Sequence, residues 1–236
     1  MTTEPSEQTL REDHPFFVAC ESCDLPALRK FFESGISVYA TSEFRPEPSA
    51  YARSCKSIEF LNLLLEFGFD VNHVAGAHGQ TELFDAVGNP DPAWIALLLD
   101  DGANVNHVDR HGRTPYLQAI AAGNSDYIAL VVSRGANTEQ IDDQGVNDFL
   151  KAAKNGHLEI MQYLLDQGRD INFTDCAGST ALVQASKSGS LEVVRWLLDH
   201  GADIDAKDGR GKTALQWAET NRHEAVAELL RQRGAK

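Results

Sequence analysis

The stretch DCAGSTALVQASKSGSLEVVRWLLDHGADIDAK, residues 175–207, decides the fold. Thr180 precedes a short apolar segment and belongs to the residue types that cap helix N-termini. Gly189 can end that helix in a left-handed conformation, and Gly201 can end a second helix in the same way. Apolar residues recur along the second segment at helical spacing: Leu191, Val194, Leu197 and Leu198. The stretch therefore predicts a helix–turn–helix followed by an extended run toward the next turn.

The same unit recurs along the chain. Glycines that follow the Leu-rich segments are spaced by 33 residues, with one step of 34: Gly35, Gly68, Gly102, Gly135, Gly168, Gly201 and Gly234. A second series lies between them, with every step 33: Gly79, Gly112, Gly145, Gly178 and Gly211. No single unit has enough apolar surface to fold alone, but stacked units bury a continuous core. A fixed period of this length predicts an all-α repeat solenoid.

The unit resembles that of the ankyrin repeat family, in which a β-turn and two helices share about 33 residues and the pattern T-P-L-H-x-A recurs. Thr114-Pro115 lies within a second clear copy, residues 109–141. The resemblance covers residues 14–236 and implies helix–turn–helix units with β-turn or hairpin fingers. It predicts seven tandem units, at about 14–41, 42–74, 75–108, 109–141, 142–174, 175–207 and 208–236. Residues 1–13 are predicted to be a disordered tail.

Three places depart from the repeat. FRPEP, residues 44–48, stands where a glycine turn is expected, and VAGAHG, residues 74–79, contains the one extra residue. NPDP, residues 89–92, replaces the glycine between two helices and predicts a proline-rich end of one helix and start of the next. The first and last units are expected to act as caps.

Gly211-Lys212-Thr213 matches the core of a phosphate-binding loop. It is, however, one member of the second glycine series, and the sister turns have other residues in place of Lys212: Gln80, Arg113, Val146 and Ser179. The preceding segment is polar and lacks the apolar strand from which such a loop grows. The sequence therefore predicts no nucleotide cofactor.

Charge limits the possible partners. The chain has 35 Asp and Glu against 21 Lys and Arg, a net charge of -14. This balance argues against nucleic acid and anionic membrane, which both need positive charge. Between Lys56 and Arg110 there is no Lys or Arg but there are nine acids. A partner with a basic patch would be attracted to this block, and a solvated acidic face is the alternative.

Cysteine use and the N-terminus bear on location. Cys20, Cys23, Cys55 and Cys176 are too few and too scattered for a disulfide scaffold, so we expect free thiols, buried or partly buried at Cys20 and Cys23. MTTEPSEQTLRED, at the start, has no secretory signature, and no apolar run reaches membrane-spanning length. These features predict a cytoplasmic protein.

Metal binding and catalysis find little support. His73 and His107, and likewise His78 and His111, occupy equivalent places in successive units, but a metal needs three or four converging ligands. No nucleophile–base pattern or carboxylate pair stands out. We therefore predict no metal site, no catalytic residues and no enzymatic activity.

The resemblance implies that protein partners bind the concave face, formed by turn tips and first helices. One first-helix position forms a stripe of polar residues in four successive units, with an aromatic residue at the same position at either end: Tyr51, Asp85, Gln118, Lys151, Gln184 and Trp217. Solvation alone, with Trp217 packed under the last unit, is the alternative for this stripe. The turn tips also vary in chemistry. The predicted partner-binding residues are Tyr51, His78, Gln80, Asp85, Arg110, His111, Arg113, Gln118, Asp143, Gln144, Val146, Lys151, Gln184 and Trp217.

The sequence thus predicts a monomeric, non-catalytic scaffold that binds a protein with a basic surface, as an adaptor or as an inhibitor of the immunity-protein kind. A regulatory or homo-oligomeric structural module is the main alternative, and a nucleotide- or metal-dependent protein is a weaker one.

Overall fold

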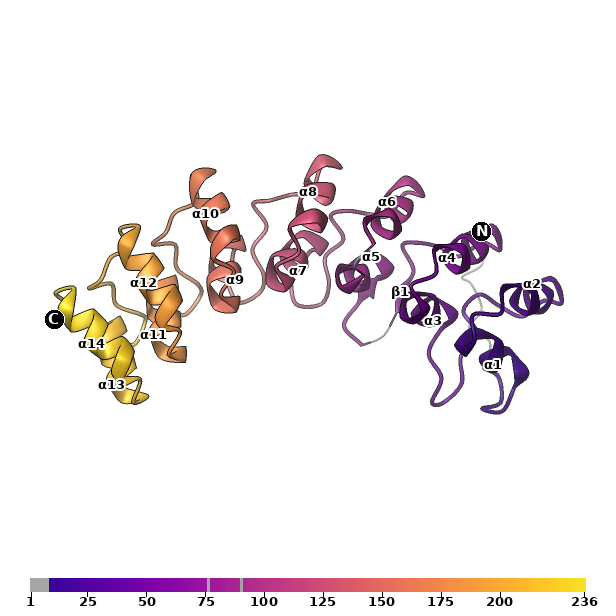
Figure 1. Cartoon of the computed structure of the whole chain (residues 1–236), viewed down its shortest axis with the longest axis horizontal. Helices are drawn as coiled ribbons and strands as arrows, with labels where there is room; N and C mark the ends of the chain where they lie inside the picture. The colour runs from indigo at the N-terminus through magenta and orange to yellow at the C-terminus, as the bar shows by residue number, and fades with distance from the viewer. Residues whose placement is uncertain (1–8, 76, 90) are drawn as a thin grey trace. The chain divides into compact units, whose positions relative to one another are not determined.

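The computed structural model describes residues 9–75, 77–89 and 91–236. The chain forms two compact units, Met1–Asn104 and Val105–Lys236, each built from consecutive pairs of helices (Figure 1). Among the described residues, no helix combines the length and the apolar character needed to cross a membrane.

Unit 1, Met1–Asn104, contains the helix pairs α1 with α2, α3 with α4, and α5 with α6. Its helices are α1 (Pro15–Glu21), α2 (Leu25–Glu33), α3 (Pro48–Cys55), α4 (Ile58–Glu66), α5 (Glu82–Asp85) and α6 (Pro92–Asp100), with the 3-10 helix η1 (Ala86–Gly88) after α5. Strands β1 (Val74–Ala75) and β2 (Gln80–Thr81) pair antiparallel, with Val74 opposite Thr81. This hairpin is the one finger with paired strands among the described residues.

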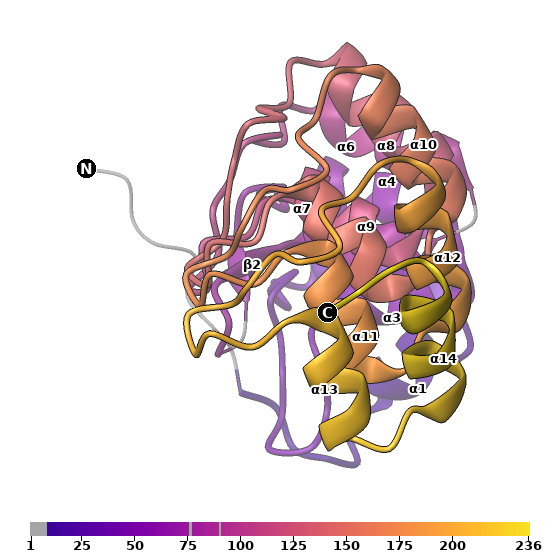
Figure 2. The same ribbon diagram turned by 90° about the vertical axis from the view of Figure 1, so that its left-hand side faces the viewer.

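Unit 2, Val105–Lys236, contains four helix pairs in its described chain. Its helices are α7 (Pro115–Ala122), α8 (Ser125–Ser133), α9 (Asp148–Asn155), α10 (Leu158–Asp166), α11 (Ala181–Ser188), α12 (Leu191–Asp199), α13 (Ala214–Thr220) and α14 (Glu224–Gln232). The first helices α7, α9, α11 and α13 stack on one another. Figure 2 shows that, within this unit, they lie between the turns and the second helices α8, α10, α12 and α14.

Capping residues explain where the first helices of unit 2 begin. The side chains of Thr114, Thr180 and Thr213 each accept a hydrogen bond from the backbone N–H three residues later, which confirms the capping role predicted for Thr180 and extends it to the sister turns. Asn147 does the same for α9. Large apolar side chains of α7, α8, α9 and α12 are fully buried: Tyr116, Leu117, Tyr127, Phe149, Val194 and Leu197.

The three places where the sequence departs from the repeat differ in local structure. Pro48 occupies the first turn of α3, and Glu47 at its N-cap makes no side-chain capping bond. In NPDP, Pro90 lies outside the described residues, but α5 gives way to η1, and Asp91 caps α6. Gly76 of VAGAHG also lies outside them.

Part of the predicted tail lies in the described chain. Residues 1–8 lie outside it, so the prediction of disorder there stays a prediction. Beyond them, the Leu10 N–H donates to the Thr41 carbonyl at 2.8 Å. Glu12 accepts from the Ser42 hydroxyl and the Phe44 N–H, at 2.7 and 3.0 Å. Residues 10 and 12 are thus tied to the loop before α3.

The cysteines require a correction. Cys23 and Cys55 form a disulfide with Cα atoms 6.7 Å apart, so the expectation of free thiols is wrong for this pair. The two residues occupy near-equivalent places at the ends of α1 and α3, and stacking of these helices brings them together. Cys20 is free and buried, as expected, and burial raises the pKa of its thiol to about 12. Because disulfides persist in oxidising compartments, cysteine use no longer argues for the cytoplasm.

Candidate partner-binding site

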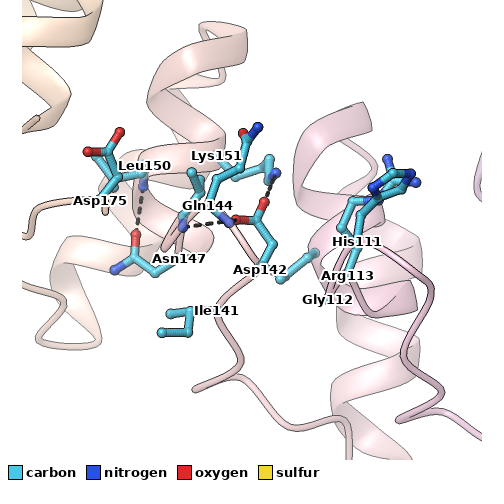
Figure 3. A network of polar contacts seen from close by, with 12 residues as sticks. His111, Gly112, Arg113, Ile141, Asp142, Gln144, Asn147, Leu150, Lys151 and Asp175 are labelled. Carbon is cyan, nitrogen blue, oxygen red and sulfur yellow. Dashed lines mark hydrogen bonds and ion pairs between the residues drawn. The ribbon is translucent and has the colours of Figure 1, made fainter. Parts of the chain in front are cut away.

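An aspartate fixes each turn of unit 2. Oδ1 of Asp142 accepts the N–H groups of Gln144 and Val146, both at 3.0 Å. Figure 3 shows Asp142 between Gln144 and Lys151. The turns at Asp109, Asp175 and Asp208 repeat this pattern with the residues two and four positions later. The four turns therefore share one backbone frame, whatever residues stand at their tips.

The second oxygen of the same aspartates reaches the predicted stripe. Oδ2 accepts from Lys151 Nζ at 2.7 Å on Asp142, from Gln184 Nε2 at 2.6 Å on Asp175, and from Trp217 Nε1 at 2.8 Å on Asp208. Each pair is nine residues apart and ties a first helix to the turn before it. These three stripe residues thus hold the scaffold together.

Asp109 makes the exception, because its Oδ2 accepts from Arg113 of its own turn at 2.8 Å. Gln118, the stripe residue nine positions later, is half-buried. Sequence reasoning missed the four aspartates as a set, although their 33-residue spacing was a usable signal.

The surroundings of Asp142 and Asp109 lower the pKa of these two turn carboxyls. Burial opposes ionisation of Asp142, but the Lys151 ammonium and the N–H groups of Val146 and Gln144 outweigh it and lower the pKa of this carboxyl. Burial likewise opposes ionisation of Asp109, and Arg113 with its backbone N–H lowers the pKa overall. The negative charges of Asp142 and Asp109 are thus paired with a neighbouring cation and with backbone N–H groups of their own turns.

Backbone hydrogen bonds join neighbouring turns of unit 2. The N–H of Asp143 donates to the His111 carbonyl at 3.1 Å, and that of Cys176 to the Gln144 carbonyl at 3.0 Å. Gly145 has a φ of 75° at this junction, and a Cβ there would lie 2.7 Å from the Cys176 nitrogen. Glycine is therefore required both by backbone conformation and by the close approach of the next turn.

The structure separates the predicted residues by exposure. The side chains of Arg110, His111, Asp143 and Gln144 are exposed at the tips in unit 2, as are His78 and Asp85 in unit 1. Tyr51, Gln80, Arg113, Gln118, Lys151 and Gln184 are half-buried. Val146 and Trp217 are only 4% and 7% exposed, so they offer a partner little side-chain surface.

Trp217 is covered by three cations. The Nζ atoms of Lys187 and Lys212 lie 4.7 and 4.4 Å from its ring centroid, and the Arg210 guanidinium lies at 5.8 Å. Lys212 is therefore engaged over an indole ring, and its backbone N–H donates to Asp208 at 3.0 Å. Thr213 caps α13. Lys212 and Thr213, which resemble a phosphate-binding loop in the sequence, thus serve the repeat, Lys212 by packing over Trp217 and Thr213 by capping α13.

The acidic block of unit 1 is dispersed over several elements. Asp91 accepts from the Ala93 N–H at 2.9 Å and caps α6, and Glu66 pairs with Arg29 at 2.5 Å. Asp100 and Asp101 are exposed at the end of α6. Two other acids of the block, Glu82 and Asp85 on α5, line a pocket of 420 Å³.

Two histidines of unit 2, His157 and His223, serve the scaffold. Nε2 of His157 lies 3.0 Å from the Ala121 carbonyl, and Nε2 of His223 lies 3.1 Å from the Lys187 carbonyl. Each contact joins the start of a second helix to the preceding helix pair. Across the described ranges, no group of three or more His, Cys, Asp or Glu residues is placed to hold a metal ion.

Comparison with known proteins agrees with this architecture. A family model described as "Ankyrin repeats (3 copies)" matches residues 49–142 and 149–236, which is more than half of the chain. No curated protein sequence matches the chain. Repeats of this family generally mediate protein–protein interactions and are typically non-catalytic. From the matched stretches and the recurring helix pairs, we conclude that the chain belongs to the ankyrin repeat family.

Proposed function

We propose that this protein is a non-catalytic, monomeric scaffold that binds a partner protein with a basic surface through its turn tips and first helices, as an adaptor or an inhibitor. Each unit carries a candidate binding surface of its own: the exposed turn tips in unit 2 and the α5 region in unit 1. Lys151, Gln184 and Trp217 belong to the support of the tips, because each is bonded to a turn aspartate.

One observation carries the proposal. The turns at Asp109, Asp142, Asp175 and Asp208 have the same pair of aspartate–backbone hydrogen bonds. Their exposed tips nevertheless differ in chemistry, with Arg110 and His111 on one and Asp143 and Gln144 on the next. A rigid frame under varied side chains is suited to recognition, because little conformational entropy is lost when a partner binds.

Charge supports a basic partner. The chain is strongly acidic, with a net charge of -14. Asp85 keeps 45% of its side chain exposed on α5, beside the buried carboxylate of Glu82. Such a surface would accelerate the approach of a positively charged protein, and salt would weaken that effect.

The test is affinity capture from a native lysate at low and high salt. We expect a captured protein with a basic surface whose recovery falls as the salt concentration rises. Capture of an acidic protein, or recovery that salt does not change, would contradict the basic-partner part of the proposal. Sedimentation equilibrium of the purified chain checks the monomeric state.

A further inference from the structure

A pocket in unit 1 lies between the loop before α3, the β1–β2 hairpin and α5. Its volume is 420 Å³, within the range of about 300–1,000 Å³ typical of ligand sites. Pro46, Ala50 and Phe69 contribute apolar wall, and Glu47, Arg53, Glu82 and Asp85 contribute charge.

Glu82 is the unusual member of this lining. Its side chain is only 4% exposed, and Arg53 forms an ion pair with Oε2. The other oxygen, Oε1, is buried and has no hydrogen-bond partner. A buried carboxylate oxygen without a donor is costly, and because Glu82 lines the pocket, this residue is a candidate acceptor for a donor that enters it.

A sister position shows what a satisfied group looks like. Asp148 stands two repeats later at the same place, the first residue after the helix cap, and is equally buried. Its Oδ2 accepts from the Tyr116 hydroxyl and from Arg169, both at 2.9 Å, and its Oδ1 accepts from the Phe149 N–H at 2.8 Å. Both carboxylate oxygens of Asp148 thus have donors, whereas Oε1 of Glu82 has none.

The charges around the pocket favour a cation. The lining contains three carboxylates, those of Glu47, Glu82 and Asp85, and one guanidinium, that of Arg53, besides two histidines. Arg53 is shared between two of them, because its Nη2 also lies 3.1 Å from Asp85 Oδ2. Glu47 has His73 at 3.3 Å as its partner. Burial raises the pKa of Glu82, and the charge of Asp85 adds to this effect. The charge and hydrogen bond of Arg53 and a weak hydrogen bond from Ser49 only partly offset it, so a second cation would favour the ionised form.

We propose that this pocket receives a lysine or arginine side chain of the partner protein, whose charged N–H group donates to Glu82 Oε1 while its stem packs against Pro46, Ala50 and Phe69. The inference rests on the proposed function and adds to it a specific anchoring pocket. Hydrogen bonds between two charged groups are stronger than those between neutral groups, so the pocket should select charged over neutral side chains.

The test uses the whole chain and simple probes. Amide NMR shifts are followed while Nα-acetyl-arginine amide or Nα-acetyl-lysine amide is added, with Nα-acetyl-citrulline amide as the neutral isostere of arginine. We expect shifts concentrated in residues 46–53 and 77–85, and affinity for at least one cationic probe about tenfold or more above that for citrulline. Equal affinity for the neutral probe, or shifts elsewhere only, would overturn the inference. Tighter binding of spermidine than of both amino-acid probes would overturn the assignment to a side chain.

Variants locate the interaction. Glu82→Gln is expected to abolish the selectivity for the cation. Glu33→Gln removes the same charge from an exposed position of unit 1 and should leave the affinity within about twofold of wild type. If folded Glu82→Gln protein binds the cationic probe like wild type, the inference is wrong. If that variant does not fold, the wild-type comparison of arginine and lysine with citrulline still decides.

The two proposals fail separately. If the pocket shows no selectivity for cations but the protein still captures a basic partner, the anchoring pocket is refuted and the proposed function stands. If the pocket selects cations but the captured partner is acidic, the basic-partner function is refuted. The assignment of the pocket to a side chain of that partner is then contradicted as well.

Discussion

Lys151 Nζ lies 2.7 Å from Asp142 Oδ2, nine residues earlier in the chain, and this ion pair ties α9 to the turn before it. Both side chains are largely buried, with 13% and 5% of their surface exposed. Lys151, which the sequence predicts to lie in a binding stripe, therefore supports the turn tips.

Lys151→Ala should lower the free energy of unfolding by about 1–3 kcal/mol, because the Asp142 carboxylate would keep its burial and lose its side-chain donor. Lys151→Gln should recover most of this loss, since Gln184 donates to Asp175 in the same way one repeat later. Urea unfolding of the three proteins measures the effect. Equal losses in the Ala and Gln variants would show that the donor to Asp142 does not matter.

Gly145→Ala should destabilise the protein more than Gly211→Ala. Both glycines have a φ of 75°, and an L-residue in that left-handed conformation costs about 1–2 kcal/mol. Only at Gly145 would the new Cβ also press on the Cys176 backbone nitrogen, whereas nothing lies within 4 Å of it at Gly211. Thermal melting of both variants isolates the cost of the clash. A Gly211 variant that is the less stable of the two would refute the close approach between turns.

Much of this frame could be predicted from the sequence. The two glycine series mark the helix ends and the turns, because glycine alone adopts left-handed φ at little cost. The threonine caps follow from residue type and position. The partners of Lys151 and Gln184 were harder to find, since a contact nine residues apart leaves no periodic apolar signal.

Other features needed three-dimensional information. Cys23 and Cys55 are 32 residues apart, and only the stacking of α1 on α3 shows that they meet. The pocket beside Glu82 depends on a hairpin and a short helix at the place where the repeat carries its one extra residue. Local deviations from a repeat are thus where sequence periodicity predicts least.

Reduction of Cys23–Cys55 should destabilise unit 1. The bond closes a loop with a sequence separation of 32, for which the loss of loop-closure entropy in the unfolded chain amounts to about 3–4 kcal/mol. Hydrogen exchange with and without dithiothreitol should show faster exchange in α1 and α3, with α11 and α13 unchanged.

The double variant Cys23→Ser and Cys55→Ser is the control for reduction, and it should show the same exchange without reductant. Exchange in α1 and α3 that is unaffected both by reduction and by the double substitution would contradict a stabilising role for the bond.

Acid should weaken the frame. The folded pKa values of Asp109 and Asp142 lie below the ordinary value of 3.8, so their contribution to stability is complete well above pH 4 and is lost as the pH falls through the folded values. Lys151→Ala removes a main cause of the shift at Asp142 and should flatten this dependence.

Urea midpoints at pH 6, 4 and 3 and constant ionic strength measure the slope. Comparing wild type with Lys151→Ala cancels the contribution of Glu82, whose raised pKa acts in the opposite direction. Identical slopes in the two proteins would exclude the Asp142 pair as a source of acid sensitivity.

The most direct test of the scaffold account is the dissociation constant of the captured partner, measured calorimetrically for a variant that alters only the tips. Arg110→Ser, Asp143→Ser and Gln144→Ser together change exposed side chains and leave Asp109, Asp142 and Gly145 in place. Glu159→Ser and Arg195→Ser on the exposed sides of α10 and α12 form the control. The account predicts binding at least about tenfold weaker for the tip variant and unchanged binding for the control. Unchanged binding by a folded tip variant, or loss confined to the control, would contradict it.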